Sequence, residues 1–283
     1  MPASVAAILV TYDSGATIER AVTALRAGAT APDPILVVDN GSTDPESLAA
    51  LERVAADATV IRLASNTGFC AANNTGFRAA GQVDHVLFCN PDAYVTPAFL
   101  AEAVRHLDEH PSVGAVGPRL LALDERGEPN GRIDSAGIGQ TWYGRFVDLD
   151  QGEADDGPGD GTARRALALC AAAVLTRRSA LDEVALREGP FDERFFMYKE
   201  DVDLGLRLHQ AGWGVELRSD LAVLHQRNLP GGLGAHRASS RAARRRSVVN
   251  EWRVWRRGTL SVARRLTMLP YLCAKTAAVS LGL

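Results

Sequence analysis

Several acidic and amide side chains in this sequence stand in patterns that could bind a nucleotide or a divalent metal ion. Asp39 opens the segment DNGS (39–42), where a carboxylate can accept a hydrogen bond from a base N–H or a ribose hydroxyl. The segment NPD (90–92) carries Asp92, whose oxygens are ligands that Mg²⁺ and similar cations prefer. A plain turn is the alternative for both segments, because Asx turns and Asn-Pro pairs are common turn chemistry.

A denser cluster lies in the segment FDERFFMYKED (191–201), where aromatic residues precede two adjacent acids, Glu200 and Asp201. The pattern predicts that these acids open a helix over 200–211. A carboxylate at this point could face a cleft and act as a general base. Acids are also favoured in the first turn of a helix by its dipole, so a structural cap is the alternative. Asp203 falls on a different helical face from Asp201.

Two further positions could contact a ligand. His225 follows a short apolar run, and a neutral imidazole is a good metal ligand, although a lone histidine is more often a packing residue. In the segment NTGF (66–69), Gly68 could permit a ligand to approach the backbone closely. The alternative there is a tight turn followed by a helix cap.

The elements that must position these residues alternate between strands and helices. Runs such as VAAILVTY (5–12) are continuously apolar and β-branched, which is typical of strands buried on both faces. The order predicts a mostly parallel sheet covered by helices, with ligands beyond the carboxyl ends of the strands. The expected strands are 5–12, 34–39, 59–63, 84–90 and 113–117, and the expected helices are 17–27, 45–56, 70–80 and 97–109.

Residues after 118 show a looser pattern. The segment 148–162 is acidic and rich in glycine, which predicts a mobile loop. Short strands are expected at 213–217 and 222–224. The Pro/Gly-rich segment RNLPGGLG (227–234) has the glycines that a closing lid needs, or it is a simple connector. One or two arginine-rich helices are expected from residue 235 onward.

The composition is that of an ordinary globular protein. Of 283 residues, 46% are hydrophobic and 23% are charged, which excludes a disordered, collagenous or disulfide-scaffold protein. Four cysteines without a CxxC pair argue against structural zinc and for a reducing compartment. The N-terminal segment lacks the features of a signal peptide, and no stretch of 18 apolar residues occurs. These features predict a cytoplasmic protein.

Charge is distributed unevenly along the chain. Residues 1–235 carry a net charge of −13, whereas residues 236–283 carry +10. In the basic segment, Trp252 and Trp255 lie among the arginines, a combination that suits the surface of an anionic membrane. Packing on the acidic body or on a second subunit, as in a homodimer, is the alternative. Nucleic-acid binding is not expected, because no base-reading motif accompanies the charge.

Taken together and in this order, these segments resemble the family 2 glycosyltransferases, in particular their rhamnosyltransferase-like branch. The resemblance covers about residues 4–226. The matching segments are ILVTYDSG, VVDNGSTD, NTGFCAANN, FCNPD, VGAVGP, GPFDERFFMYKEDVDLGLRLHQAGW and AVLH. The resemblance implies a GT-A fold, an α/β nucleotide-diphospho-sugar transferase fold. It divides the chain into a catalytic domain (1–234, with a donor half 1–118 and an acceptor half 119–234) and a helical extension (235–283).

The resemblance also implies a role for each matching residue. Asp201 matches the family's catalytic base, and Glu200 would orient this base or the acceptor. Asn90-Pro91-Asp92 stands where the family's DxD motif stands, which makes Asp92 the carboxylate on the metal side. His225 matches a histidine that completes the metal site in some relatives. The residues implied around the nucleotide sugar are Thr11, Tyr12, Asp13, Asp39, Asn66, Gly68, Asn74 and Asn90.

The implied activity is an inverting, metal-dependent transfer of a sugar from a nucleotide-diphosphate donor to a glycan, glycolipid or small-molecule acceptor. The implied cofactor is Mg²⁺ or Mn²⁺, and dTDP-L-rhamnose is the expected donor. A UDP-hexose or UDP-galactofuranose donor is the main alternative, and a non-catalytic binder of sugar nucleotides is another. A dinucleotide-dependent dehydrogenase is excluded, because no GxGxxG follows the first strand. A nucleotidylyltransferase would need a Gly-rich loop with Arg or Lys after the first strand, and the segment TYDSG (11–15) at this position lacks one.

Overall fold

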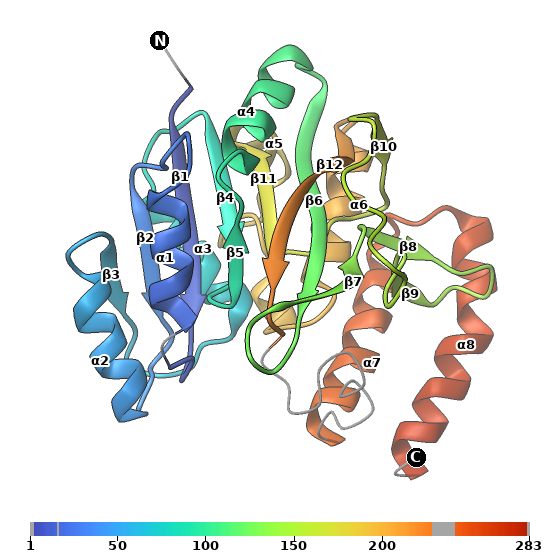
Figure 1. The fold of residues 1–283 in the computed structure, drawn as a ribbon. Helices are drawn as coiled ribbons and strands as arrows, with labels where there is room; N and C mark the ends of the chain where they lie inside the picture. The colour runs from blue at the N-terminus through green and yellow to red at the C-terminus, as the bar shows by residue number, and fades with distance from the viewer. Residues whose placement is uncertain (1–2, 16, 228–240, 282–283) are drawn as a thin grey trace.

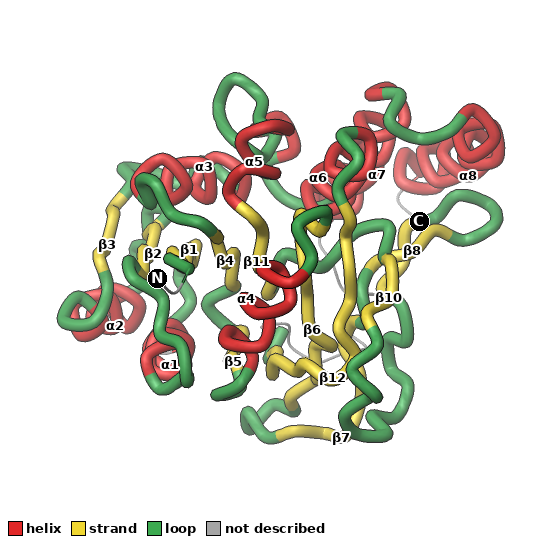
Figure 2. The backbone as a smooth tube through the Cα atoms, turned by 90° about the horizontal axis from the view of Figure 1, so that it is seen from above, coloured by secondary structure: helices red, strands yellow, loops and turns green. Residues whose placement is uncertain are grey.

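A ten-stranded mixed sheet runs through the molecule between two layers of helices (Figures 1 and 2). The computed structural model describes residues 3–15, 17–227 and 241–281. The strand order is β10-β12-β6-β11-β4-β1-β2-β3, with β5 paired to β12 and β7 paired to β6. This arrangement, with helices on both faces, confirms the α/β class expected from the sequence.

The N-terminal half of the sheet is parallel. Its strands lie in the order β4-β1-β2-β3, and the register places Thr11 beside Asp39. Because all four strands run the same way, their carboxyl ends meet at one edge of the sheet (Figure 1). The elements of this half are β1 (Val5–Thr11), α1 (Thr17–Arg26), β2 (Ile35–Asp39), α2 (Pro45–Val54), β3 (Thr59–Arg62), α3 (Phe69–Ala79) and β4 (His85–Cys89).

The second half of the sheet mixes strand directions. β11 (Ala173–Arg177) lies antiparallel between β4 and β6 (Val113–Leu123), and β6 runs through residue 118, so the two predicted halves of the domain share this strand. β12 (Gly214–His225) is one long strand parallel to β6, with an irregularity between Arg218 and Ala222. The sequence predicted two short strands here. The remaining elements are β5 (Ala93–Val95), α4 (Phe99–Glu109), β7 (Pro129–Ser135), β8 (Ile138–Gln140), β9 (Phe146–Asp148), β10 (Ala163–Arg165), α5 (Arg178–Val184), η1 (Glu193–Phe195) and α6 (Glu200–Gln210).

Alternation of side chains along β1 explains the two-layered core. Ala6, Ile8 and Val10 pack on one face of the sheet, in a cluster that includes side chains of α3, α5 and α6. Ala7 and Leu9 point to the other face and join side chains of α1, α2 and α4. Both faces are therefore buried, as the continuous apolar run predicted.

Two helices complete the described chain. α7 (Arg241–Arg257) packs on the body beside α6, and α8 (Val262–Leu281) lies against α7 at the far end of the molecule (Figures 1 and 2). Among the described residues, no helix is both long enough and apolar enough to cross a bilayer. Residues 228–234 of the predicted lid lie outside the described residues. The predicted loop 148–162 is irregular after β9, and Ala154 in it bridges to Arg132.

Candidate functional site

The carboxyl ends of β1 and β2 form the first part of the candidate site. Asn40 donates its backbone N–H to the carbonyl of Thr11 at 2.8 Å, which joins the two strand ends. Thr11 and Asp39 are almost fully buried, whereas 48% of Tyr12 is exposed. Tyr12 is thus the residue at this edge whose aromatic face is open to a planar ligand.

Two predicted nucleotide-site acids use part of their hydrogen-bonding capacity on the protein itself. Oδ1 of Asp39 accepts from the backbone N–H of Ser42 at 2.9 Å, which is the Asx turn considered as the alternative. Oδ1 of Asp13 accepts from the backbone N–H groups of Thr43 and Asp44 at 2.8 and 2.9 Å. Asp13 therefore ties the loop after β1 to the loop after β2.

A pair of asparagines links the end of β2 to the loop before α3. Asn40 donates its amide to Oδ1 of Asn66 at 3.1 Å and accepts from the backbone N–H of Thr67 at 2.8 Å. Gly68 has φ +90°, and a Cβ added there would lie 2.5 Å from the ring of Phe196. The sequence attributed this glycine to the approach of a ligand. In the structure, Gly68 makes room for Phe196 of the loop before α6.

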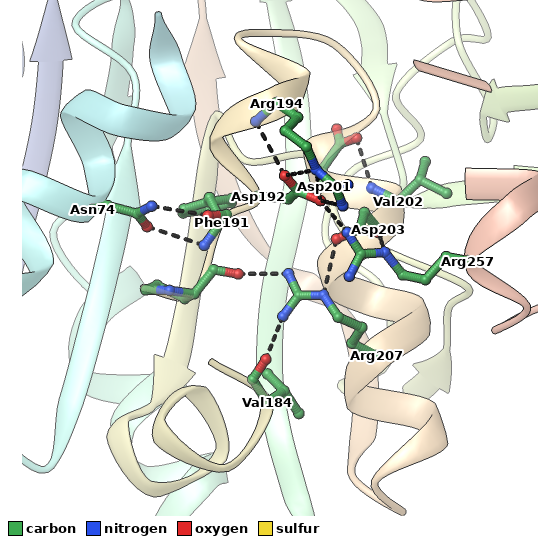
Figure 3. Close-up of polar contacts among 11 residues, drawn as sticks. Asn74, Val184, Phe191, Asp192, Arg194, Asp201, Val202, Asp203, Arg207 and Arg257 are labelled. Atoms are coloured by element: carbon green, nitrogen blue, oxygen red, sulfur yellow. Dashed lines mark hydrogen bonds and ion pairs between the residues drawn. The ribbon is translucent and has the colours of Figure 1, made fainter. Parts of the chain in front are cut away.

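Asn74, predicted beside the nucleotide sugar, binds the backbone of a distant segment. Its side chain is fully buried on α3, where it donates to the carbonyl of Phe191 at 2.8 Å and accepts from the Phe191 N–H at 3.0 Å (Figure 3). Both ends of the amide are therefore bound to one backbone residue. Asn74 therefore fixes the segment that leads to the acids of α6.

Asp92 and His225 lie together at the end of β4 and β12. The antiparallel pairing of β5 with β12 sets Ala93 opposite His225, and Oδ1 of Asp92 lies 3.5 Å from Nε2 of His225. Asn90, half-buried beside them, donates its backbone N–H to the Ala172 carbonyl. The two residues predicted as metal ligands are thus neighbours.

A third residue, Asp134 on β7, orients this histidine. Oδ2 of Asp134 lies 2.7 Å from Nδ1 of His225, and Nε of Arg227 lies 2.7 Å from Oδ1 of the same carboxylate. Burial lowers the pKa of His225, but the carboxylates of Asp92 and Asp134 raise it more, to about 9. A carboxylate on one nitrogen of an imidazole whose other nitrogen faces a ligand site is the usual support of a metal-binding histidine. To bind a divalent cation beside Asp92, His225 would have to give up the proton on Nε2, and no three such side chains of the described residues converge on one point.

Glu200 and Asp201 open α6, as the sequence predicted. Glu200 is buried, and Asp201 is partly exposed, with its Oδ1 accepting from the Val202 N–H at 2.8 Å (Figure 3). Burial raises the pKa of Glu200 to about 8, and the charge of Asp201 contributes to this rise. Burial also raises the pKa of Asp201, to about 6. The two carboxyls titrate as a coupled pair, and burial keeps them from both being ionised until the pH is above the usual range of a carboxyl.

The backbone before these acids is strained and is held from the C-terminal helix. Phe196, Tyr198 and Lys199 have φ values of 62°, 74° and 70°, which side chains with a Cβ rarely adopt. The fully buried amide of Asn250 on α7 donates to the carbonyls of Phe195, Met197 and Tyr198 at 2.8–2.9 Å. We therefore assign Asn250 as a positioning residue for the start of α6.

The other acids of this segment form a buried ionic cluster. Asp203 pairs with Arg207 on its own helix at 2.9 Å, and Arg257 of α7 pairs with both Asp192 and Asp203 (Figure 3). Arg207 also donates to the carbonyls of Val184 and Pro190 at 2.6 and 2.5 Å. The cluster joins the loop before α6, α6 itself and the C-terminal helix into one unit.

Sequence reasoning missed the residues that reach the site from distant segments. Asp134, Arg227, Asn250 and Arg257 support Asp92, His225 and the acids of α6, yet none stands in a recognisable motif. Asn250 is the one asparagine within the basic helix 241–257, and this isolated amide was the single feature of the sequence that could have indicated its role.

Comparison with protein families gives one match. The model of the family described as Glycosyl transferase family 2 matches residues 6–176. This range holds β1, β2, the NPD segment and Asp134, and it ends before the acids of α6.

Two kinds of curated relatives are similar in sequence. The N-acetylglucosaminyl-diphospho-decaprenol L-rhamnosyltransferase of Mycobacterium tuberculosis is 30% identical over 238 residues, which cover 78% of this chain and 75% of that protein. The O-antigen biosynthesis protein RfbC of Myxococcus xanthus is 32% identical over 200 residues, which cover 68% of this chain but 15% of that protein.

Two solved structures share the fold. A crystal structure of GalNAc-T7 with UDP, GalNAc and Mn²⁺ matches with a TM-score of 0.69 at 17% identity, covering 89% of this chain and 47% of that one. The mannosyltransferase PcManGT of Pyrobaculum calidifontis, in complex with GDP-Man and Mn²⁺, matches with a TM-score of 0.61 at 17% identity, covering 99% and 76%. Both likenesses confirm the GT-A fold.

Proposed function

The chain belongs to glycosyl transferase family 2, and from this premise we propose that it transfers L-rhamnose from dTDP-L-rhamnose to an acceptor hydroxyl, with inversion at the anomeric carbon. One observation carries the proposal: the partly exposed carboxyl of Asp201 opens α6, and α6 packs on β12, the strand that ends in His225 of the Asp92–His225 pair. The rhamnosyl donor is supported by the name of the Mycobacterium tuberculosis relatives.

The donor nucleotide would bind at the carboxyl ends of β1 and β2. Tyr12 offers an exposed ring for a base, and Oδ2 of the buried Asp39 carboxylate makes no hydrogen bond within the described residues. At this point, Oδ2 of Asp39 could accept a hydrogen bond from a base N–H or a sugar hydroxyl of the donor nucleotide. Asn66, bound to Asn40 and Gly68, would shape the pocket wall rather than contact the nucleotide through its carbonyl oxygen.

Asp201 would act as the general base. As the acceptor oxygen attacks the anomeric carbon, its O–H bond breaks, and the proton passes to the carboxylate of Asp201. The raised pKa of Asp201, about 6, brings this base nearer to the pKa that suits proton transfer at neutral pH. Glu200 would stay protonated and so avoid a second negative charge beside the base.

Asp92 and His225 would hold a Mg²⁺ or Mn²⁺ ion, with Asp134 fixing the orientation of the imidazole. When bound, such an ion supplies positive charge for the leaving nucleoside diphosphate. The chain itself would keep the two ligands buried and aligned through Arg227, which pairs with Asp134 and Asp148. The acceptor class that we propose is a lipid-linked or polysaccharide glycan, in line with the names of the curated relatives.

Thermal stabilisation by dTDP, UDP and GDP, with and without Mn²⁺, tests the donor site. We expect a Mn²⁺-dependent rise in Tm with dTDP, since a ligand at 100 times its Kd stabilises by about 2.7 kcal/mol. Asp92→Ala should abolish the Mn²⁺-dependent part, whereas Asp57→Ala, which changes an exposed acid in the turn after α2, should leave it unchanged.

Other outcomes would revise the proposal. A rise with UDP alone would move the donor to a UDP-sugar and retain the mechanism. Nucleotide binding without turnover of any donor, in the wild-type protein and in Asp201→Asn alike, would replace the transferase by a sugar-nucleotide-binding partner. The absence of any rise would contradict the assignment of the donor site.

Asn250→Ala is expected to reduce kcat by about tenfold or more while leaving the nucleotide Kd within about twofold. The truncation removes the donor to three carbonyls of the strained loop, which costs about 1–3 kcal/mol in unfolding free energy. Urea unfolding and nucleotide titration measure the two effects. Val249→Ala, on the exposed side of the same turn, is the matched control. An equal loss of kcat in both variants would show that Asn250 has no special role.

A further inference from the structure

Helix α8 is apolar on two sides, and only one of them is covered. Its inner side buries Met268, Leu272 and Val279. On its outer side, small and large apolar residues recur every three or four positions and are exposed, which places them in one line along the helix. This outer stripe consists of Val262, Leu266, Pro270, Cys273, Ala274, Ala277 and Leu281. Over the 20 residues of α8 it extends about 30 Å.

The outer stripe holds some of the most exposed large apolar side chains in the described chain. Val262 is 71% exposed, Leu266 is 65% exposed and Leu281 is 77% exposed. Trp142, at 86%, lies at the tip of the β8–β9 hairpin beside α8, where the rings of Tyr143 and Tyr271 are 5.7 Å apart (Figures 1 and 2). An exposed tryptophan beside an uncovered apolar helix marks an interaction surface.

The helices α7 and α8 carry a net positive charge, and they expose no acid. The one acid in α7 and α8 is Glu251, which is 1% exposed and paired with Lys275 at 2.8 Å. The hairpin tip 141–145 has no acid. The exposed cations of these segments are Arg145, Arg241, Arg245, Arg256 and Arg264.

The tryptophans that the sequence pointed to are not part of this surface. Trp252 donates its ring N–H to the hydroxyl of Thr276 at 3.0 Å, and Trp255 donates to the Arg265 carbonyl at 2.9 Å. Both rings are half-buried between α7 and α8. They join the two helices, and the outer stripe stays uncovered.

We propose that the outer stripe of α8 docks this protein on an anionic lipid bilayer, with α8 lying in the plane of the interface. Arg264, Arg265 and Lys275 interrupt the apolar sequence of α8, which suits a helix on the surface rather than across it. The surrounding arginines would pair with anionic headgroups. The inference deepens the proposed function and rests on it for one point, the lipid-linked class of acceptor.

A second copy of this chain is the less favourable occupant. A twofold interface would place the outer stripe against itself and bring two positively charged pairs of helices close together. Juxtaposed like charges oppose such an interface, whereas anionic headgroups satisfy them. The charge pattern therefore favours lipid.

Co-sedimentation of the full chain with phosphatidylcholine vesicles, with and without phosphatidylglycerol, tests the proposal. We expect binding to the vesicles that contain phosphatidylglycerol and little to the others. Val262→Ser with Leu266→Ser keeps the charge and should weaken binding about tenfold or more. Arg264→Glu should weaken it about fivefold or more. Arg126→Glu, an exposed residue in the turn after β6, carries the same charge change away from α8 and should bind as the wild type does.

Three results would overturn the docking surface. One is wild-type binding that is the same with both kinds of vesicle. Another is equal loss of binding in Arg264→Glu and Arg126→Glu. The third is a dimer in sedimentation velocity that the double serine variant turns into a monomer with unchanged vesicle binding. Nucleotide stabilisation of the same samples in the absence of vesicles separates this failure from a failure of the donor site.

Discussion

Asp201→Asn is expected to lower kcat by about 10²–10⁴-fold while leaving the nucleotide Kd nearly unchanged. Asn keeps the shape of the side chain, and its oxygen can still accept from the Val202 N–H, the bond that Asp201 makes at 2.8 Å. It cannot take up the acceptor proton. Steady-state rates with the donor identified by nucleotide stabilisation, together with the Kd from titration, would separate the two effects.

Glu200→Gln is the informative companion of this variant. Burial raises the pKa of Glu200 to about 8, and the uncharged amide of Gln resembles the protonated carboxyl. Glu200→Gln should therefore lower kcat by less than about tenfold. A loss in Glu200→Gln as large as that in Asp201→Asn would contradict the assignment of Asp201 as the single base.

The pH profile of the wild-type protein follows from the same pair. The base must be ionised, so kcat/KM should rise with pH up to about 6, the pKa of Asp201, and should fall about tenfold for each pH unit below it. Above about 8, ionisation of Glu200 puts a second negative charge beside the base, and the rate should fall again. In Glu200→Gln the upper limb should vanish and the lower limb should remain. If the residual activity of Asp201→Asn no longer falls at acidic pH, the lower limb of the wild-type profile reports the ionisation of Asp201.

The parts of the site that follow buried strands could be predicted from the sequence for a physical reason. Parallel strands end at one edge, so polar residues directly after β1, β2 and β4 must lie there, whatever the details of packing. Asp39 and Asp92 were placed in this way. The pairing of His225 with Asp92 also follows, because β12 carries the histidine to the same edge.

Asn74 and Gly68 show what a local pattern leaves open. An asparagine or glycine near a strand end looks alike whether its partner is a ligand or another backbone. Asn74 turned out to bind Phe191, and Gly68 turned out to admit the ring of Phe196. Asp134 and Asn250 come from segments 91 and 52–55 residues away in sequence from the groups they hold, and no spacing rule connects them.

Arg257→Ala is expected to lower the free energy of unfolding by about 3 kcal/mol. Asp192 and Asp203, both nearly fully buried, each pair with this guanidinium, and removal of one partner from a buried ion pair costs about 3–5 kcal/mol. Arg207 still neutralises Asp203, and Arg194 still contacts Asp192, which places the effect at the low end. Urea unfolding of the full chain measures it, with the exposed neighbour Arg256→Ala as control at under about 0.5 kcal/mol.

The pH dependence of this loss identifies its origin. Burial raises the pKa of Asp192, but Arg194 and Arg257 lower it more, so the net shift is below 3.8. A carboxyl with a lowered pKa in the folded protein stabilises it above the ordinary pKa and loses this contribution as pH falls through the folded value. Asp203, the other partner of Arg257, has a pKa that burial raises above 3.8, so the difference between wild type and Arg257→Ala should be largest near pH 7, should begin to shrink as Asp203 is protonated, and should shrink further as Asp192 is protonated. A difference that stays constant with pH would mean that Arg257 acts through packing of α7 alone, and that the ionic cluster does not couple the C-terminal helix to the acids of α6.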